Sequence, residues 1–259
     1  KLDCCKITAT GNRQKNLLIC GGNGSGKTTF MLGLWGEFLR RRIETGSGFI
    51  PLYVSLSDYP EDADWRQGDT QDSFILRQIC MNCYGAANLA GCSPDLLSGL
   101  AAEFAKENDA PQYVLLADGL DEVKPEVRGL LHYELRTFSE KSNLRVIVTS
   151  RCQDLALGAF DLIETDGLSD EALLRFLSEH GFSRGECGKA EANRTLMRLI
   201  RYPMYLAMLC RLHDSGQRVT DITRTGRLLH RYFLMGKERE RIDRISGRRS
   251  DGENEKMLL

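Results

Sequence analysis

The stretch that most constrains the fold of this chain is GGNGSGKTT, at positions 21–29. It follows the short apolar run NLLIC and precedes FMLGLWGEFL, which has helical spacing of apolar residues. It matches the pattern Gly-x-x-x-x-Gly-Lys-Ser/Thr, in which glycines let successive backbone N–H groups turn toward a phosphate. A strand, this loop and a helix N-terminus together predict a phosphate-binding loop, or P-loop.

Each part of the loop has an expected role. The Lys27 ammonium is expected to reach the β- and γ-phosphates, and the Thr28 hydroxyl is expected to bind Mg²⁺. The whole set of expected nucleotide contacts in the loop is Gly21, Gly22, Asn23, Gly24, Ser25, Gly26, Lys27, Thr28 and Thr29. The alternative, a flexible glycine-rich turn, does not account for the position of the loop between a strand and a helix.

The first two thirds of the chain alternate strand and helix patterns. Strands are expected at 16–20, 52–56, 113–118, 144–150 and 160–165, and helices at 28–42, 71–84, 93–107 and 125–140. This alternation predicts an α/β fold with a mostly parallel sheet flanked by helices. Pro51 is expected to mark the beginning of the second strand. The first helix is expected to pack through one face that includes Phe30, Met31, Leu34, Trp35 and Phe38.

After about residue 167 the strand signals stop. Helical patterns continue at 169–181, 189–200, 203–213 and 222–241. We therefore expect a P-loop nucleotide-binding domain over 1–167 and a small all-helical domain over 168–259. The charged tail after about residue 236 is open to two interpretations, a solvated helix end or the start of a further region.

A second group of polar residues follows the apolar strand in YVLLADGLDEV. A carboxylate at the end of a buried strand beside a P-loop is where an acid that orders Mg²⁺ belongs, which assigns that role to Asp118. Asp121 or Glu122 would orient or deprotonate an attacking water, and we favour Glu122 as the base. The alternative is an ordinary strand followed by an acidic turn.

The strand RVIVTSR ends in Thr149, Ser150 and Arg151. These polar groups are expected to face the γ-phosphate. Arg151 would sense that phosphate or stabilise the charge that develops during its transfer. The alternative is a surface arginine that happens to follow a strand.

The composition argues against nucleic acid and membrane as partners and favours the cytoplasm. The net charge is −1, so the chain as a whole does not attract nucleic acid, and no apolar run is long enough for a membrane helix. The nine scattered cysteines favour free thiols in a reducing compartment, which predicts the cytoplasm. Cys80, Cys83 and Cys92 have zinc-like spacing but supply only three of four ligands.

These motifs together resemble the NACHT family of signal-transducing (STAND) NTPases. The resemblance covers about 16–240 and rests on LLADGLDE, PLYVSLSDY, VIVTSR, GLSDEALLRFL and RYPMYLAMLC. It implies that Pro203, in the helical domain, packs near the adenine. The chain departs from the family pattern at Cys152, where proline is often found, and at Arg201 and Tyr202. The histidine that the family's winged-helix domain supplies is not matched, because His230 lies too early.

The resemblance implies an ATP/ADP-dependent switch. ADP would bridge the two domains, and exchange for ATP would expose surfaces for homo-oligomerisation, with slow Mg²⁺-dependent ATP hydrolysis as the reset. It implies defence or innate-immune signalling through an effector domain before this segment and a sensing array after it, and a truncated winged-helix start near its end. ATP is favoured over GTP because no Asn-Lys-x-Asp motif is found.

Two rival functions remain open. One is a turnover AAA-like ATPase that acts on protein or nucleic acid, for which the basic-rich stretch 224–249 is the candidate surface. The other is a scaffold that keeps its nucleotide without hydrolysing it.

Overall fold

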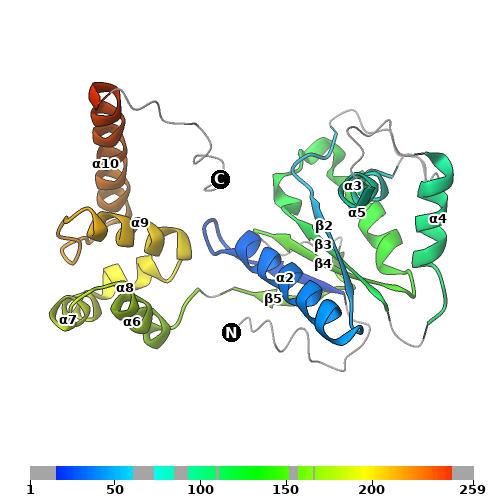
Figure 1. Cartoon of the computed structure of the whole chain (residues 1–259), viewed down its shortest axis with the longest axis horizontal. Coiled ribbons are helices and arrows are strands. Elements are labelled where there is room, and N and C mark those ends of the chain that lie inside the picture. The colour runs from blue at the N-terminus through cyan, green and yellow to red at the C-terminus, as the bar shows by residue number, and fades with distance from the viewer. Residues whose placement is uncertain are drawn as a thin grey trace. The chain divides into compact units, whose positions relative to one another are not determined.

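The computed structural model describes residues 16–60, 73–84, 93–108, 111–151, 157–165 and 167–246, without the side chains of 83–84 and 238–246. The chain divides into two compact units, unit 1 over Lys1–Asp166 and unit 2 over Gly167–Leu259. Unit 1 contains the sheet, and the described part of unit 2 is helical (Figure 1). The expected start of a winged-helix region, in the last residues of the chain, stays a prediction.

The sheet of unit 1 is parallel throughout, as the alternating pattern predicted. Its strands are β1 (Leu17–Cys20), β2 (Ile50–Ser55), β3 (Tyr113–Asp118), β4 (Leu144–Ser150) and β5 (Asp161–Glu164). Their spatial order is β2-β3-β4-β1-β5. Strand β4 therefore lies between β1, which leads into the P-loop, and β3, which ends in Asp118. Because the strands are parallel, their carboxyl ends meet at one edge of the sheet.

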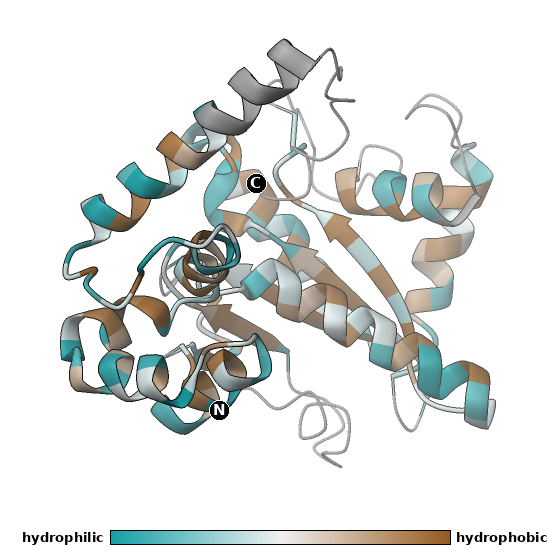
Figure 2. Cartoon of the chain, turned by 60° about the vertical axis from the view of Figure 1, so that its left-hand side comes forward, coloured by the Kyte–Doolittle hydropathy of each residue, from teal (hydrophilic) through white to brown (hydrophobic). Residues whose placement is uncertain are grey.

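Helices cover both faces of this sheet (Figure 1). They are α2 (Lys27–Thr45), α3 (Phe74–Tyr84), α4 (Pro94–Phe104) and α5 (Pro125–Ser139), with the short 3₁₀ helix η3 (Leu120–Glu122) after β3. Alternate strand residues serve the two faces. Leu17, Val114 and Ile147 pack with α2, whereas Leu18, Leu115 and Val148 pack with α3, α4 and α5. Figure 2 shows the strands as largely hydrophobic.

Two local expectations about this layer were wrong. Pro51 lies inside β2 and pairs with Val114, because β2 is at the edge of the described sheet, where the missing N–H of proline leaves none of the described strands unpaired. Trp35 is 39% exposed, whereas Met31, Leu34 and Phe38 are buried under the sheet. The buried face of α2 is therefore narrower than its apolar pattern.

Unit 2 has its own hydrophobic core. Its helices are α6 (Asp170–Glu179), α7 (Arg184–Ala192), α8 (Arg194–Ile200), α9 (Pro203–Asp214) and α10 (Thr225–Ser246). The helix expected at 189–200 is divided at Asn193. The Asn193 side chain accepts the Leu196 N–H (3.1 Å) and donates to the carbonyls of Thr220 (3.3 Å) and Ile222 (3.0 Å). These bonds begin α8 and hold the segment before α10.

A buried acid joins α5 to α3. The Glu134 carboxylate is fully buried, and its Oε1 accepts the Ile75 N–H (2.9 Å) and the Ser73 hydroxyl. Burial raises the pKa of Glu134 to about 7, and the two hydrogen bonds act in the opposite direction. The folded state therefore keeps Glu134 protonated up to a higher pH than the unfolded chain does.

Glu134 should make the stability of the chain depend on pH. An unfolded glutamate ionises near pH 4.3. The contribution of protonated Glu134 to the free energy of unfolding is therefore complete below that pH and is lost as pH rises to about 7. The decline should not exceed about 1.4 kcal/mol per pH unit. Glu134→Gln should flatten this part of the curve in urea unfolding measured from pH 4.5 to 7.5. Glu126→Gln, an exposed acid of the same helix, should not, and equal slopes for wild type and Glu134→Gln would contradict the assignment.

Candidate nucleotide-binding site

The P-loop occupies the turn between β1 and α2. Gly24 and Gly26 have φ angles of 72° and 86°, the left-handed region that favours glycine. Gly26 is the N-cap of α2 and makes no side-chain capping bond, so the N–H groups of the first helical turn lack a cap. The Ser25 hydroxyl is buried and has no hydrogen-bond partner among the described residues. Uncapped N–H donors and an unpaired hydroxyl fit an incoming phosphate.

The Thr165 side chain gives a second reason for glycine at position 21, beyond the P-loop motif. A Cβ atom at Gly21 would lie 1.7 Å from the Thr165 Oγ1 and 3.1 Å from the Thr165 Cβ, so a side chain there would force Thr165 to move. The Gly21 N–H donates to the Ser150 carbonyl (3.2 Å). The first glycine of the loop is therefore fixed between the ends of β4 and β5.

Lys27 folds back over the loop. Its Nζ donates to the carbonyls of Gly21 (2.6 Å) and Gly22 (3.2 Å). Burial lowers the pKa of Lys27, while the Asp121 carboxylate acts in the opposite direction. Thr28 and Thr29, at the start of α2, are exposed, as is Asn23 in the loop. Thr28 is thus exposed at the start of α2, whereas the Lys27 ammonium lies against the carbonyls of the loop.

Asp118 is held by two hydroxyl groups. It is 8% exposed; its Oδ1 accepts the Thr149 hydroxyl, and its Oδ2 accepts the Tyr53 hydroxyl (3.2 Å). The Thr149 Oγ1 also accepts the Gly119 N–H (2.8 Å). Thr149 therefore braces Asp118, rather than facing the γ-phosphate as the sequence suggested. The carboxylate is held in one orientation at the end of β3.

Tyr53 was missed by the sequence analysis. It lies inside β2, within the quoted PLYVSLSDY, and the pattern alone gives it no contact with Asp118. The contact exists because β2 and β3 are neighbours in register, with Ser55 opposite Asp118. Only the strand order reveals this partner.

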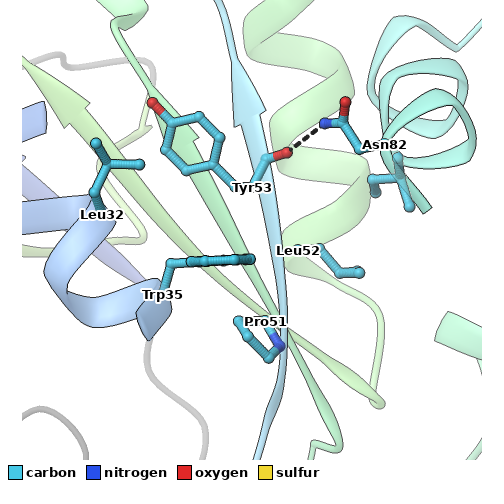
Figure 3. Close-up of a pocket in the computed structure, with 7 residues that line it drawn as sticks. Leu32, Trp35, Pro51, Leu52, Tyr53 and Asn82 are labelled. Carbon is cyan, nitrogen blue, oxygen red and sulfur yellow. Dashed lines mark hydrogen bonds between the residues drawn. The ribbon is translucent and has the colours of Figure 1, made fainter. Parts of the chain in front are cut away.

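The Tyr53 ring also forms one wall of an apolar pocket. The pocket has a volume of about 380 Å³ and is lined by Leu32, Trp35, Pro51, Leu52, Tyr53, Ile79 and Asn82. Figure 3 shows the phenol extending from β2 toward α2, and the Asn82 amide hydrogen-bonded to the Tyr53 carbonyl (2.9 Å). Side-chain and backbone contacts on two sides thus fix the tyrosine that holds Asp118.

Tyr53→Phe should weaken Mg²⁺ binding at the site without unfolding the chain. Losing a hydrogen bond to a metal-ligating carboxylate costs about 10- to 100-fold in metal affinity. We expect the Mg²⁺ concentration that half-saturates nucleotide binding to rise by about tenfold. Tyr113→Phe is the matched control, because that hydroxyl contacts Glu103 at the other end of β3 (3.5 Å). An unchanged Mg²⁺ titration for Tyr53→Phe would contradict a role for this bond.

The two acids after Asp118 have different surroundings. Asp121 and Glu122 both lie on η3, which follows Gly119 at φ 90°. Asp121 accepts the Arg151 N–H at Oδ1 (2.8 Å), and its Oδ2 lies 2.6 Å from the Arg151 Nε. The Glu122 side chain is exposed, and within the described ranges no hydrogen bond or ion pair engages its carboxylate. Glu122 is the acid that is open to a water molecule.

The charges of this edge fit a metal-bound polyphosphate. Lys27 and Arg151 bring two cations, and Asp118, Asp121 and Glu122 bring three carboxylates. A polyphosphate would add further negative charge, so its binding needs a cation that accepts oxygen ligands, such as Mg²⁺. Thr28 and Asp118 would hold it, with phosphate oxygens and water completing the shell. The described part of the chain has no cluster of three His, Cys, Asp or Glu residues arranged to hold a metal by themselves.

Some predicted residues belong to unit 2 or lie outside the described residues. Pro203 is the first residue of α9 in unit 2 and is partly buried, and its role beside adenine stays a prediction. Cys80 is buried in α3, whereas Cys152, Cys92 and the Cys83 side chain lie outside the described residues, which leaves the zinc alternative untested. No helix in the described ranges is long and apolar enough to cross a membrane.

Comparison with known proteins identifies the fold. No protein-family model matches the chain, and no curated protein sequence matches it. Among solved structures, the Aeropyrum pernix ORC2 protein in its ADP form has a TM-score of 0.52 at 12% identity, with 88% of this chain and 64% of that chain covered. A Walker-type ATPase of Pyrococcus abyssi has a TM-score of 0.50 at 13% identity, with 95% and 75% covered. This chain spans less than two thirds of the ORC2 chain.

Proposed function

We propose that this chain binds ATP and ADP with Mg²⁺ at the carboxyl edge of its sheet, hydrolyses ATP slowly, and acts as a switch through nucleotide exchange. The chain has the fold of a P-loop NTPase, with AAA+ ATPases among its structural neighbours, and a helical unit follows the sheet. One observation carries the nucleotide part of this proposal. The P-loop follows β1, and the doubly held Asp118 and the open Glu122 are at the end of β3, at the same edge of the sheet with only β4 between the two strands.

Each group would have one task. Lys27 and the N–H groups of the loop would bind the phosphates, and Thr28 and Asp118 would hold Mg²⁺. Bound Mg²⁺ would neutralise negative charge on the phosphates. Glu122 would orient the attacking water and accept its proton, and Arg151 would contact the terminal phosphate.

The switch part rests on the resemblance to the NACHT family and on the presence of a second compact unit. A ligand shifts a conformational equilibrium only through different contacts in the two states. We propose that Arg151 in unit 1 and Pro203 in unit 2 provide those different contacts. Homo-oligomerisation on activation, effector and sensing partners, and a place in defence signalling in the cytoplasm follow from the same resemblance.

A turnover ATPase is the second candidate, because the structural neighbours of this chain fit that function at least as well as they fit a switch. Two measurements separate the two functions. One is the rate of ATP hydrolysis, and the other is the molar mass by light scattering, with ADP and with a slowly hydrolysed ATP analogue. A switch should turn over far below about 10 s⁻¹, the median for enzymes, and should grow in mass only with the ATP analogue. Faster hydrolysis that an added protein or nucleic acid stimulates, with no change in mass, would favour the turnover ATPase.

A further inference from the structure

Asp121 contacts Arg151 at two points. The Asp121 Oδ1 accepts the Arg151 backbone N–H at 2.8 Å, and its Oδ2 lies 2.6 Å from the Arg151 Nε in an ion pair. The Asp121 side chain is only 13% exposed, whereas that of Arg151 is 51% exposed. The carboxylate is thus sheltered, and the guanidinium extends from it into solvent.

The backbone that carries Asp121 is itself held. Arg128 of α5 donates through Nη2 to the carbonyls of Asp121 (3.2 Å) and Val123 (2.8 Å). On the other side, the Gly119 N–H donates to the buried Thr149 hydroxyl (2.8 Å). Asp121 is therefore a fixed acceptor rather than a residue on a loose turn.

The way in which Asp121 holds Arg151 leaves part of the guanidinium open. A guanidinium is a planar fork with five N–H donors, and a phosphate is best bound by two parallel donors. Asp121 forms its ion pair with Arg151 at Nε. Within the described residues, no hydrogen bond or ion pair engages Nη1 or Nη2. Those two groups form the remaining pair of donors.

We propose that Asp121 is a positioning residue, which holds Arg151 by its backbone and Nε so that the two Nη groups are kept for the terminal phosphate of ATP. This inference rests on the proposed function and adds a cause for the preference between ATP and ADP. An arginine loses rotamer freedom when it is ordered, and the pair with Asp121 removes part of that cost before the nucleotide arrives. The two adjacent acids then divide their roles, since Asp121 accepts a hydrogen bond at Oδ1 and forms an ion pair at Oδ2, whereas the Glu122 carboxylate is open.

The test is a double-mutant cycle on nucleotide affinity. The dissociation constants of ADP and of a slowly hydrolysed ATP analogue, both with Mg²⁺, are measured by calorimetry for wild type, Asp121→Asn, Arg151→Ala and the double variant. The readout is the ratio of the two constants, because ADP affinity reports whether the loop is intact. Arg151→Ala should lower the preference for the ATP analogue by about tenfold. Asp121→Asn should lower it in the same direction, and the double variant should equal Arg151→Ala.

Two further variants keep the result interpretable. Glu126→Gln removes one exposed carboxylate from the start of α5 and should leave the ratio unchanged. Arg151→Lys should lose the preference as Arg151→Ala does, because lysine lacks the planar fork.

The outcomes separate this inference from the proposed function. If wild type prefers the ATP analogue and Asp121→Asn keeps that preference, or strengthens it, the positioning role is overturned. A wild-type ratio that Arg151→Ala does not change would overturn it as well. If wild type binds neither nucleotide, the proposed function fails and the inference fails with it.

Discussion

Replacing Glu122 by glutamine should lower ATP hydrolysis by about 100-fold or more, while ATP and ADP affinities stay near those of wild type. Glu122 is the acid of this edge whose carboxylate is open, and glutamine keeps its size while removing the ability to accept a proton. Phosphate release at saturating ATP measures hydrolysis, and calorimetry measures binding. ATP should therefore persist on the variant.

The matched control for this prediction is Asp121→Asn, which changes the neighbouring acid in the same way. Asp121→Asn should act mainly on the preference between ATP and ADP, whereas Glu122→Gln should act on hydrolysis alone. Hydrolysis by Glu122→Gln at the wild-type rate would exclude Glu122 as the base. In that case, the rate of ATP hydrolysis by wild type would separate the two alternatives, a scaffold that does not hydrolyse its nucleotide and a turnover ATPase.

Lys27→Ala should weaken the binding of both nucleotides by about 100-fold. The ammonium is the only cation that the P-loop itself carries, and it already lies against the carbonyls of Gly21 and Gly22. Without it, the phosphates would lose a charge-assisted donor in a site where carboxylates outnumber the remaining cation. Fluorescent nucleotide titration with Mg²⁺ measures the effect.

Lys189→Ala, an exposed lysine of α7 in unit 2, is the control for a general change in charge. Urea unfolding without nucleotide should be nearly the same for Lys27→Ala and wild type, since the hydrogen bonds of the Lys27 side chain among the described residues stay within the loop. Equal nucleotide affinities for Lys27→Ala and wild type would show that the loop does not bind phosphate.

Local patterns predicted the framework of unit 1 well. The four-residue β1 leads into the P-loop, and Asp118 ends a strand whose residues are buried almost throughout, because these features depend on adjacent residues alone. The parallel sheet followed from the alternation of strands and helices. Errors arose where the position of a strand in the sheet matters. Pro51 is one case, because a proline is tolerated inside a strand when that strand lies at the edge of the sheet.

The contacts that shape the site could not be predicted in the same way. Tyr53 reaches Asp118 only because β2 neighbours β3, and the Thr165 side chain lies against Gly21 only because β5 neighbours β1. Likewise, Asp121 and Glu122 are adjacent in an acidic turn and look equivalent in the sequence. Their difference comes from Arg151, at the end of the separate strand β4.

The most direct test of this account is the nucleotide content of the purified protein, compared between wild type and Lys27→Ala. Each protein is denatured, the released nucleotide is identified by chromatography, and the amount is compared with the protein concentration. The account predicts stoichiometric ADP or ATP from wild type, or stoichiometric uptake when nucleotide and Mg²⁺ are added, and little from Lys27→Ala. A wild-type protein that neither carries nor takes up nucleotide would contradict it.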